Sequence, residues 1–263
     1  MNDPFIVDAH AHLGLPGVFF TPRSGPNHLL QLMDLLSIRF TVLGCDHTTL
    51  HEGAGTGLPA LRRVHDESQG RIFYLGVFHP AHGPECLAAL KESVAWPGFA
   101  GVKLHPSFHG TRADDPVYEE AWRFAAEHDL PILAHSWSVS AYNPVQRYST
   151  PERFEAYARQ FPQVRLVLGH AGGRGSGRHE AIRMANEYPN VYLDLAGDVF
   201  CYRLVETLAE AVPPEKILFG SDFPWIDPRA NLSRVLLADI DDRLKRKILS
   251  DNAHTVYGIQ AES

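Results

Sequence analysis

The sequence predicts a single (β/α)8 barrel, a TIM barrel, that spans residues 1–263 as one domain. A length of 263 residues suits this fold, which routinely occupies such a chain as one unit. Short apolar runs alternate with amphipathic stretches eight times along the chain. In addition, polar residues with metal-binding or acid–base chemistry stand at the carboxyl ends of four of these runs.

The apolar runs are predicted to be strands of a parallel sheet, because they are nearly continuous in apolar residues and therefore suit burial on both faces. A doubly wound open sheet is the alternative. Only a closed sheet, however, gathers the ends of strands one, five, six and eight at one shared mouth. The predicted strands are Phe5–His12, Phe40–Cys45, Ile72–His79, Ala100–His105, Ile132–Trp137, Val164–Ala171, Val191–Ala196 and Ile217–Asp222.

The amphipathic stretches between the strands are predicted to be helices. Pro84, Pro116 and Pro151 suit a first helical turn, where a missing N–H group costs nothing. An eighth helical region is expected in two pieces near the end of the chain. The predicted helices are His28–Ser37, Leu58–Ser68, Pro84–Ala95, Pro116–His128, Pro151–Phe161, Arg178–Tyr188, Tyr202–Ala211, and then Asn231–Leu237 with Arg243–Ser250.

Loop composition differs between the two ends of the predicted strands. Gly14–Asn27, Ser138–Thr150 and Gly172–Gly177 follow strands and are rich in Gly, Pro, Ser and aromatic residues. Connections at the amino ends of strands are shorter, as in 129–131. This asymmetry is expected where the loops after the strands build an active site.

Two histidines stand two residues apart at the end of the first strand. Side chains alternate along a strand, so His10 and His12 are predicted to share a face, with Asp8 behind them on the same face. We expect Asp8 to orient one of the two imidazole rings, as carboxylates do around metal-bound histidines.

Further candidate ligands end other strands. They are His135, His170 and Asp222. Imidazole and carboxylate ligands with one position left open are typical of catalytic zinc, whereas closed structural sites favour thiolates. We predict one divalent metal ion, zinc, with manganese, iron and cobalt as alternatives that suit the same ligands. The predicted ligand set is His10, His12, His135 and Asp222.

The motifs that carry these residues resemble the amidohydrolase superfamily, in particular its amidohydrolase-related branch of small single-domain barrels. The resemblance spans nearly the whole chain. It implies that His10, His12, His135 and Asp222 hold the metal, that Asp222 also accepts a proton from water, and that His170 beside the ion transfers protons. The matching segments are Asp8–Leu13, Gly101–Pro106, Ala134–His135, Gly169–Gly173, Gly220–Pro224 and Asp251–His254.

Lys103 and His105 are two apart on the fourth strand, so both are expected inside the barrel. Some members of the superfamily carry a carboxylated lysine on this strand, which bridges two metals. Lys103 is expected to lie too deep for that role and to be neutral or ion-paired. For His105 three roles stay open, namely contact with the substrate, contact with a second metal, and support of the ligands from behind.

Substrate-binding residues are predicted on the loops around the mouth. Trp137 and Trp225 closely follow candidate metal residues and can wall an aromatic or apolar pocket, although packing at the rim is the alternative. Arg174 and Arg178 flank a glycine-rich turn that can hold a carboxylate or phosphate, or can form a solvated loop. With His105, we take Trp137, Arg174 and Trp225 as the candidate substrate contacts.

The leading functional hypothesis is a metal-dependent hydrolase that attacks a small-molecule ester, lactone or amide with a metal-activated water. The alternative is a nonoxidative decarboxylase, since the same branch contains enzymes similar to aminocarboxymuconate-semialdehyde decarboxylase. A TatD-like nuclease shares the first-strand histidines but has a glutamate motif where this chain has Gly101-Val102-Lys103. A pure metal carrier is disfavoured by the open coordination position.

Composition limits the partners and the compartment. A net charge of −7 without a long basic run argues against nucleic acid as a partner, and no apolar run approaches the ~20 residues of a membrane span. Residues 1–4 lack a secretory pattern, and Cys45, Cys86 and Cys201 suggest reduced thiols in the cytoplasm. A small molecule is the expected partner, and homo-oligomer formation is left open.

Overall fold

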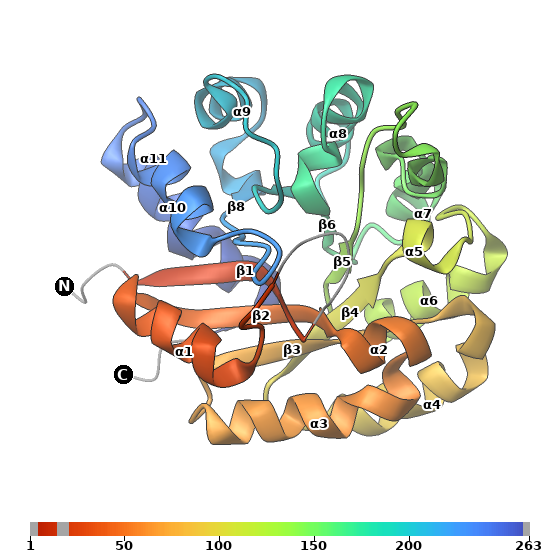
Figure 1. Ribbon diagram of the computed structural model, residues 1–263. Coiled ribbons are helices and arrows are strands. Elements are labelled where there is room, and N and C mark those ends of the chain that lie inside the picture. Colours follow the sequence, from red (N-terminus) through yellow and green to blue (C-terminus); the bar gives the residue numbers. More distant parts are fainter. Residues whose placement is uncertain (1–4, 15–20, 260–263) are drawn as a thin grey trace.

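The computed structural model describes residues 5–14 and 21–259. Eight parallel strands in this part of the chain succeed one another in chain order around a single sheet (Figure 1). This arrangement confirms the predicted (β/α)8 barrel. The strands are β1 (Ile6–Leu13), β2 (Ile38–Asp46), β3 (Ile72–Val77), β4 (Phe99–Leu104), β5 (Ile132–Ala134), β6 (Leu166–Leu168), β7 (Val191–Asp194) and β8 (Ile217–Leu218).

Backbone hydrogen bonds join β1 to β8 and the segment after it. The amide of Ala9 donates to the carbonyl of Phe219 at 2.9 Å, and the amide of Asp222 donates to the carbonyl of His10 at 2.8 Å. The amide of His12 donates to the carbonyl of Phe223 at 2.6 Å. The first and last strands therefore meet, and the open doubly wound sheet is excluded.

Helices alternate with the strands and form the outer layer (Figure 1). The major predicted helices are present, with ends shifted by a few residues. Three short helices, α2, α5 and α12, were not predicted. The helices are α1 (Pro26–Leu35), α2 (His47–Glu52), α3 (Ala54–Glu67), α4 (Gly83–Ser93), α5 (Pro106–His109), α6 (Glu119–Glu127), α7 (Glu155–Gln160), α8 (Gly175–Glu187), α9 (Leu204–Ala211), α10 (Pro228–Leu236), α11 (Asp242–Arg246) and α12 (Asn252–Tyr257).

Short helical turns fill several connections. η2 and η4 precede α6 and α7, so each of these predicted helices begins as a 3₁₀ turn. The segment η7, in contrast, is a π-helical turn between α11 and α12. The turns are η1 (Pro80–His82), η2 (Pro116–Tyr118), η3 (Pro144–Tyr148), η4 (Pro151–Phe154), η5 (Gly169–Gly172), η6 (Pro214–Lys216) and η7 (Lys247–Asp251).

Strands β5, β6 and β8 are shorter than predicted, because the chain leaves the sheet just before its polar residues. His170, Ala171 and Asp222 have φ values of 61°, 47° and 63°, in the left-handed region that few non-glycine residues adopt. His170 and Asp222 therefore lie on sharp turns immediately after their strands rather than on the strands. Such backbone strain is common at functional sites.

The barrel interior is apolar below the polar residues. Val7, Ala9, Val42, Leu133 and Leu218 belong to one buried cluster, which extends to the side chains of α12. The hydroxyl of Tyr257 on this helix donates to the carbonyl of Ala9 at 3.2 Å. Helix α12 therefore packs against the barrel interior, and the core ends in a separate polar layer.

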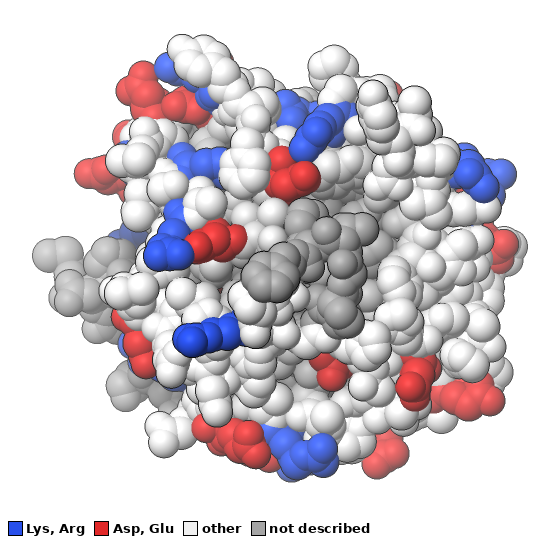
Figure 2. Space-filling model, viewed as in Figure 1, with Lys and Arg blue, Asp and Glu red and all other residues white. Residues whose placement is uncertain are grey.

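The surface in the view of Figure 2 carries Lys and Arg side chains interspersed with Asp and Glu, without a continuous area of one sign. None of the helices in the described ranges combines the length and apolar character that crossing a membrane requires. Part of the predicted loop Gly14–Asn27, residues 15–20, lies outside the described residues.

Gly101 on β4 allows a close backbone contact between neighbouring strands. Its φ is 147°, and a Cβ atom added there would lie 2.6 Å from the carbonyl oxygen of Pro131. We expect Gly101→Ala to lower the free energy of unfolding by about 1–3 kcal/mol, the usual cost of a strained backbone position. Thermal and denaturant unfolding measure this.

Gly83→Ala is the matched control. A Cβ at Gly83 meets only the ring of Phe78, at an ordinary 3.5 Å. Its φ of −49° is compatible with alanine. Equal stability of the two variants would show that the β4–β5 contact does not constrain the fold.

Candidate metal centre and active site

Three predicted ligands converge at the carboxyl end of the barrel. The rings of His10 and His12 lie 4.9 Å apart between centroids. Asp222 Oδ1 is 3.2 Å from His12 Nε2 and 4.0 Å from His10 Nε2. The three residues are buried, and their ligand atoms lie within 4.8 Å of one another. Two imidazoles and one carboxylate around a common point are the donor set of catalytic zinc sites.

The surroundings of the Asp222 carboxylate favour a cation at this point. Its Oδ1 atom is buried yet accepts no hydrogen bond among the described residues. Burial raises the pKa of the Asp222 carboxyl to about 6. An unpaired buried carboxylate is costly unless a positive charge stands beside it. A divalent ion between Asp222, His10 and His12 would supply that charge.

Asp194, at the end of β7, fixes the orientation of His10. Its Oδ2 lies 2.8 Å from His10 Nδ1, and its Oδ1 accepts the amide hydrogens of His170 at 2.8 Å and Ala196 at 3.0 Å. With its Nδ1–H directed to Asp194, neutral His10 carries its lone pair on Nε2, the nitrogen that faces Asp222. Sequence analysis missed Asp194, although an acidic residue at the end of a strand was the available signal.

His10, His170 and Asp194 form a second group whose potential ligand atoms lie within 4.8 Å of one another. Both carboxylate oxygens of Asp194 already accept hydrogen bonds. Asp194 is therefore better suited to position His10 than to bind an ion. The group around Asp222 retains the free oxygen.

Asp8 does not hold a histidine ring, and the expected role is wrong. Its Oδ1 accepts the backbone amides of Ser221 at 2.8 Å and His10 at 3.3 Å. Between Asp8 and Ala11 strand β1 advances three residues while its partner β2 advances two. This bulge breaks the strict alternation of side chains, so Asp8 does not share the face of His10 and His12. Burial raises the pKa of Asp8 to about 7.

His135 and His170 lie together beside the converging ligands. His135 Nδ1 is 3.1 Å from His170 Nε2, and His135 Nε2 is 3.0 Å from Gln146 Oε1. Both nitrogens of His135 thus have partners, so metal binding by this residue stays a prediction that requires one contact to be exchanged. Gln146 was not singled out in the sequence. The ring of His170 lies 5.1 Å from that of His10.

The second ring nitrogen of His170, Nδ1, lies in a crowded environment. His170 Nδ1 is buried without a hydrogen-bond partner in the described part of the chain. A Cβ atom added at Gly197, whose φ is 89°, would lie 2.6 Å from this nitrogen. Only glycine at position 197 therefore leaves room for the imidazole.

Lys103 reaches His10, one of the predicted metal ligands, which corrects the expectation that it lies too deep. Its side chain is fully buried, and its Nζ atom is 3.1 Å from His10 Nε2. Burial is the main cause that lowers the pKa of Lys103. A lowered pKa favours the neutral amine, which is the form compatible with a nearby metal ion.

The pKa values of three imidazoles of the site are lowered, which favours their neutral forms. Burial, reinforced by neighbouring positive groups, lowers the pKa values of His10 and His135 well below the usual range. Burial is also the main reason that the pKa of His12 is low. His12 Nδ1 lies 3.0 Å from the thiol of Cys45, a residue that sequence analysis did not single out. Metal ligands must be deprotonated, so this environment suits coordination.

The predicted substrate contacts lie at different distances from the ligands. Trp225 stands 4.7 Å from the ring of His12, and Trp137 stands 5.3 Å from that of His170. His105 stacks on His135 at 4.1 Å and is 8% exposed. Arg174 is exposed and forms an ion pair with Asp198 at 3.2 Å. The tryptophans thus border the ligand cluster, whereas Arg174 belongs to the rim.

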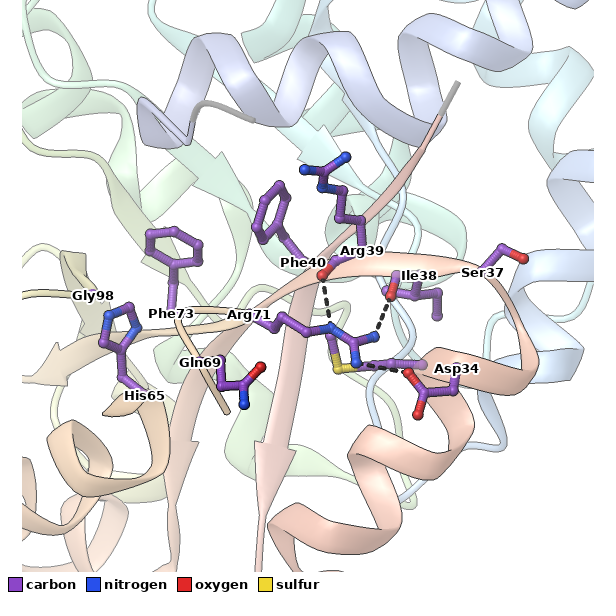
Figure 3. Close-up of a pocket in the computed structure, with 12 residues that line it drawn as sticks. Asp34, Ser37, Ile38, Arg39, Phe40, His65, Gln69, Arg71, Phe73 and Gly98 are labelled. Atoms are coloured by element: carbon purple, nitrogen blue, oxygen red, sulfur yellow. Dashed lines mark hydrogen bonds and ion pairs between the residues drawn. The ribbon is translucent and has the colours of Figure 1, made fainter. Parts of the chain in front are cut away.

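The hollows in the described structure lie outside this cluster, and two of them adjoin elements discussed above. A groove of about 640 Å³ at the rim is lined by Arg174, Asp198 and Phe200, among others. A larger cavity of about 770 Å³ lies at the amino ends of β2 and β3 (Figure 3).

In this larger cavity Arg71 donates to Asp34 and to the carbonyls of Ile38 and Arg39. Its guanidinium group therefore fastens the strand ends. The cavity is at the end of the barrel opposite to the one where TIM-barrel enzymes carry their active sites.

Comparison with known proteins gives one family and a shared fold. Residues 7–259 match the family model described as amidohydrolase. A solved structure described as an amidohydrolase II has a TM-score of 0.77 and 18% identity, covering 97% of this chain and 100% of its own. No curated protein matches the chain.

Decarboxylases share the fold as well. The 2,6-dihydroxybenzoate decarboxylase from Rhizobium has a TM-score of 0.77 and 15% identity, covering 97% of this chain and 98% of its own. The 5-carboxyvanillate decarboxylase from Novosphingobium aromaticivorans, solved with bound manganese, has a TM-score of 0.75 and 10% identity, covering 98% of each chain.

Replacing Asp194 tests whether it positions His10. Asp194→Asn keeps an oxygen for the two backbone amides but removes the charge that holds His10 Nδ1–H. We expect metal affinity to fall by about 10–100-fold, the usual loss when such a partner is replaced. Metal analysis after equilibrium dialysis, with circular dichroism as the folding check, measures this. Asp198→Asn at the rim is the control, and equal affinities of the two variants would refute the role.

Proposed function

We propose that this chain, which belongs to the amidohydrolase family, is a metal-dependent hydrolase of a small-molecule ester, lactone or amide. The convergence of Asp222, His10 and His12 around a buried, unpaired carboxylate oxygen carries the proposal. A bound divalent ion supplies Lewis acidity there, polarising a carbonyl oxygen and making water more acidic. The remaining tasks fall to side chains of the barrel mouth.

Asp222 is placed to accept a proton from the attacking water. Its Oδ1 faces the two imidazoles of β1 and is the proposed ligand atom, so the other carboxylate oxygen is left to take the proton. His170 stands on the other side of His10 and shares a contact with His135. Two groups that can exchange protons thus flank one point, which is the arrangement that proton transfer to a leaving group requires.

Asp194 and Lys103 position this machinery. Asp194 binds both the His10 ring and the backbone amide of His170, so one carboxylate orients a metal ligand and the proton-transferring residue. Lys103 Nζ contacts His10 Nε2 from within the barrel. We propose a single tightly held ion, because a second, bridged ion would require carboxylation of Lys103.

The ion is proposed to be zinc, on the basis of two imidazoles and one carboxylate as ligands. Manganese is the main alternative, because it is bound in a 5-carboxyvanillate decarboxylase of the same fold. Iron and cobalt suit the same ligands.

Nonoxidative decarboxylation is the second candidate reaction. The two tryptophans beside His12 and His170 offer flat apolar walls to an aromatic ring. Decarboxylases named for dihydroxybenzoate and carboxyvanillate share the fold. In that reaction Trp137 and Trp225 hold the ring of an aromatic acid, and Asp222 or His170 delivers the proton that replaces carbon dioxide.

We further propose a cytoplasmic enzyme with a small molecule as its partner. Cys45, Cys86 and Cys201 are all free, which suits a reducing compartment. The interspersed charges in Figure 2 support a small-molecule substrate over nucleic acid.

The reaction is tested with the purified chain, a panel of lactones, esters, amides and hydroxylated aromatic acids, and two readouts. Acid release on the first three classes, without carbon dioxide, is the expected result. Carbon dioxide from an aromatic acid would establish the second candidate instead. Activity should disappear on chelation and return with zinc or manganese. Turnover that survives chelation would contradict both reactions on this site.

His170→Asn separates proton transfer from metal binding. We expect near-normal metal content and turnover reduced by about 10²–10⁴-fold, because acid–base assistance is lost while the convergent ligands remain. His179→Asn, at an exposed position on α8, is the control and should behave as the wild type. Metal loss in His170→Asn would make His170 a ligand, and unchanged turnover would leave it a packing role.

A further inference from the structure

The groove of about 640 Å³ at the rim, called the rim groove below, is a part of the barrel to which the proposed reaction assigns no task. Its walls come from the segments that follow β6, β7 and β8, which are neighbours in the sheet. The groove therefore lies at the carboxyl end of the barrel, as the ligand cluster does. The lining residues used in this section are Arg174, Arg178, Asp198, Phe200, Cys201 and Ile226.

Two walls of the rim groove adjoin the ligand cluster. The amide of Ile226 donates to the carbonyl of Asp222 at 3.2 Å. Asp198 directly follows Gly197, the residue that packs against the ring of His170. Because both walls are one residue or one hydrogen bond away from groups of the proposed active site, a substrate whose reacting group lies at the cluster can extend into the groove.

Arg178 is a half-buried cation without a carboxylate partner in the described part of the chain. Its Nη2 donates to the carbonyl of Gly173 at 3.0 Å, and its Nη1 donates to the thiol of Cys201 at 3.2 Å. Its Nε is buried and makes no hydrogen bond among the described residues. A guanidinium group has five N–H donors, and sulfur is a weak acceptor. Most of the hydrogen-bonding capacity of Arg178 is therefore not taken up by the protein.

The place of Arg178 on α8 is unfavourable for a cation. Arg178 is the fourth residue of this helix, close to the amino end, which carries a partial positive charge. No side chain caps this end, and the first turn contains no acidic residue. Helix stability therefore does not account for an arginine at this position, whereas a bound anion beside it would.

The remaining lining residues define the kind of anion. Arg174 is paired with Asp198, Nη2 to Oδ2 at 3.2 Å. The charged lining residues are the two arginines and this aspartate, so one positive charge is uncompensated. Phe200, which is 57% exposed, adds an apolar surface. One net charge beside an apolar surface suits a short apolar chain that ends in a singly charged carboxylate better than it suits a phosphate dianion.

We propose that the rim groove binds a carboxylate of the substrate. The substrates are then esters, lactones or amides that carry a free carboxylate away from the bond that is cleaved. Arg178 supplies charged hydrogen bonds, for which the planar guanidinium fork is suited to both carboxylate oxygens. This inference rests on the proposed metal-dependent hydrolase and specifies its substrate class.

Glutarate tests binding without turnover, by saturation-transfer NMR titration of the metal-loaded full-length chain. We expect Arg178→Gln to raise the Kd of glutarate by about 10–100-fold, the equivalent of lost charged hydrogen bonds. Arg147→Gln is the matched control and should bind as the wild type does. Arg147 also donates to one carbonyl and one side chain and has no carboxylate partner in the described residues, but it is exposed, so water meets its other donors.

Three outcomes of this titration would overturn the proposal. They are equal Kd values for the wild type and Arg178→Gln, equal losses in Arg178→Gln and Arg147→Gln, and loss of glutarate binding in Asp222→Ala, which would place glutarate at the ion. Inorganic phosphate that binds more tightly than glutarate would overturn the choice of a carboxylate. Circular dichroism of each variant confirms that folded chains are compared.

A pair of esters connects the rim groove with the reaction. The compound para-nitrophenyl hydrogen glutarate has a free carboxylate, which para-nitrophenyl methyl glutarate masks. We expect Arg178→Gln to lower kcat/KM for the acid by about 10–100-fold and to leave that for the masked ester near the wild-type value. An equal fall for both esters would make Arg178 a structural residue and contradict the proposal. If the wild type cleaves neither ester, the hydrolase proposal fails for this class, while the glutarate titration still decides the groove.

Discussion

The 2.8 Å hydrogen bond from the Asp222 amide to the His10 carbonyl is the contact on which the active site depends. It joins residues 212 positions apart and belongs to the set of backbone bonds that closes the barrel. Because β8 is only two residues long, side-chain ladders contribute little at this seam. The polypeptide backbone itself therefore brings the carboxylate of the last unit to the imidazoles of the first, and a barrel left open would have no convergent donor set.

The sequence was sufficient for the barrel and for the convergence of His10, His12 and Asp222, because both are consequences of periodicity and of the parallel direction of the strands. It was insufficient wherever a residue acts through a neighbouring strand. Asp194 has no motif around it, and its role arises only once β7 pairs with β6 and the carboxylate meets the His170 amide. The placement of Asp8 failed for a different reason. Two-residue alternation cannot anticipate the bulge that turns this side chain toward Ser221.

The polar layer above the apolar interior contains several buried ionisable groups, and hydrogen bonds offset the cost of burial for only some of them. Asp8, Asp194 and Asp222 have raised pKa values, and Lys103 has a lowered one, all chiefly because of burial. Both oxygens of Asp194 accept hydrogen bonds, from backbone amides and a ring N–H, whereas Asp8 accepts backbone amides at Oδ1 alone and leaves Oδ2 unpaired in the described structure. Asp222 Oδ1 is not compensated in this way. The hydrogen bonds thus go chiefly to Asp194, which organises the site, and not to Asp222 Oδ1, the oxygen that we propose binds the ion.

The contact between Gly197 and the His170 ring links two positions that are far apart along the chain and lie on different loops. Any side chain at 197 would displace the imidazole, so substitutions of Gly197 are excluded for as long as His170 is needed. The order of the two substitutions is therefore fixed, with position 170 changing first. A descendant enzyme that exchanges His170 for a smaller residue becomes free to acquire a side chain at 197, and that side chain would enter the vacated volume beside the metal ligands. A new specificity could arise there by two substitutions in a fixed order.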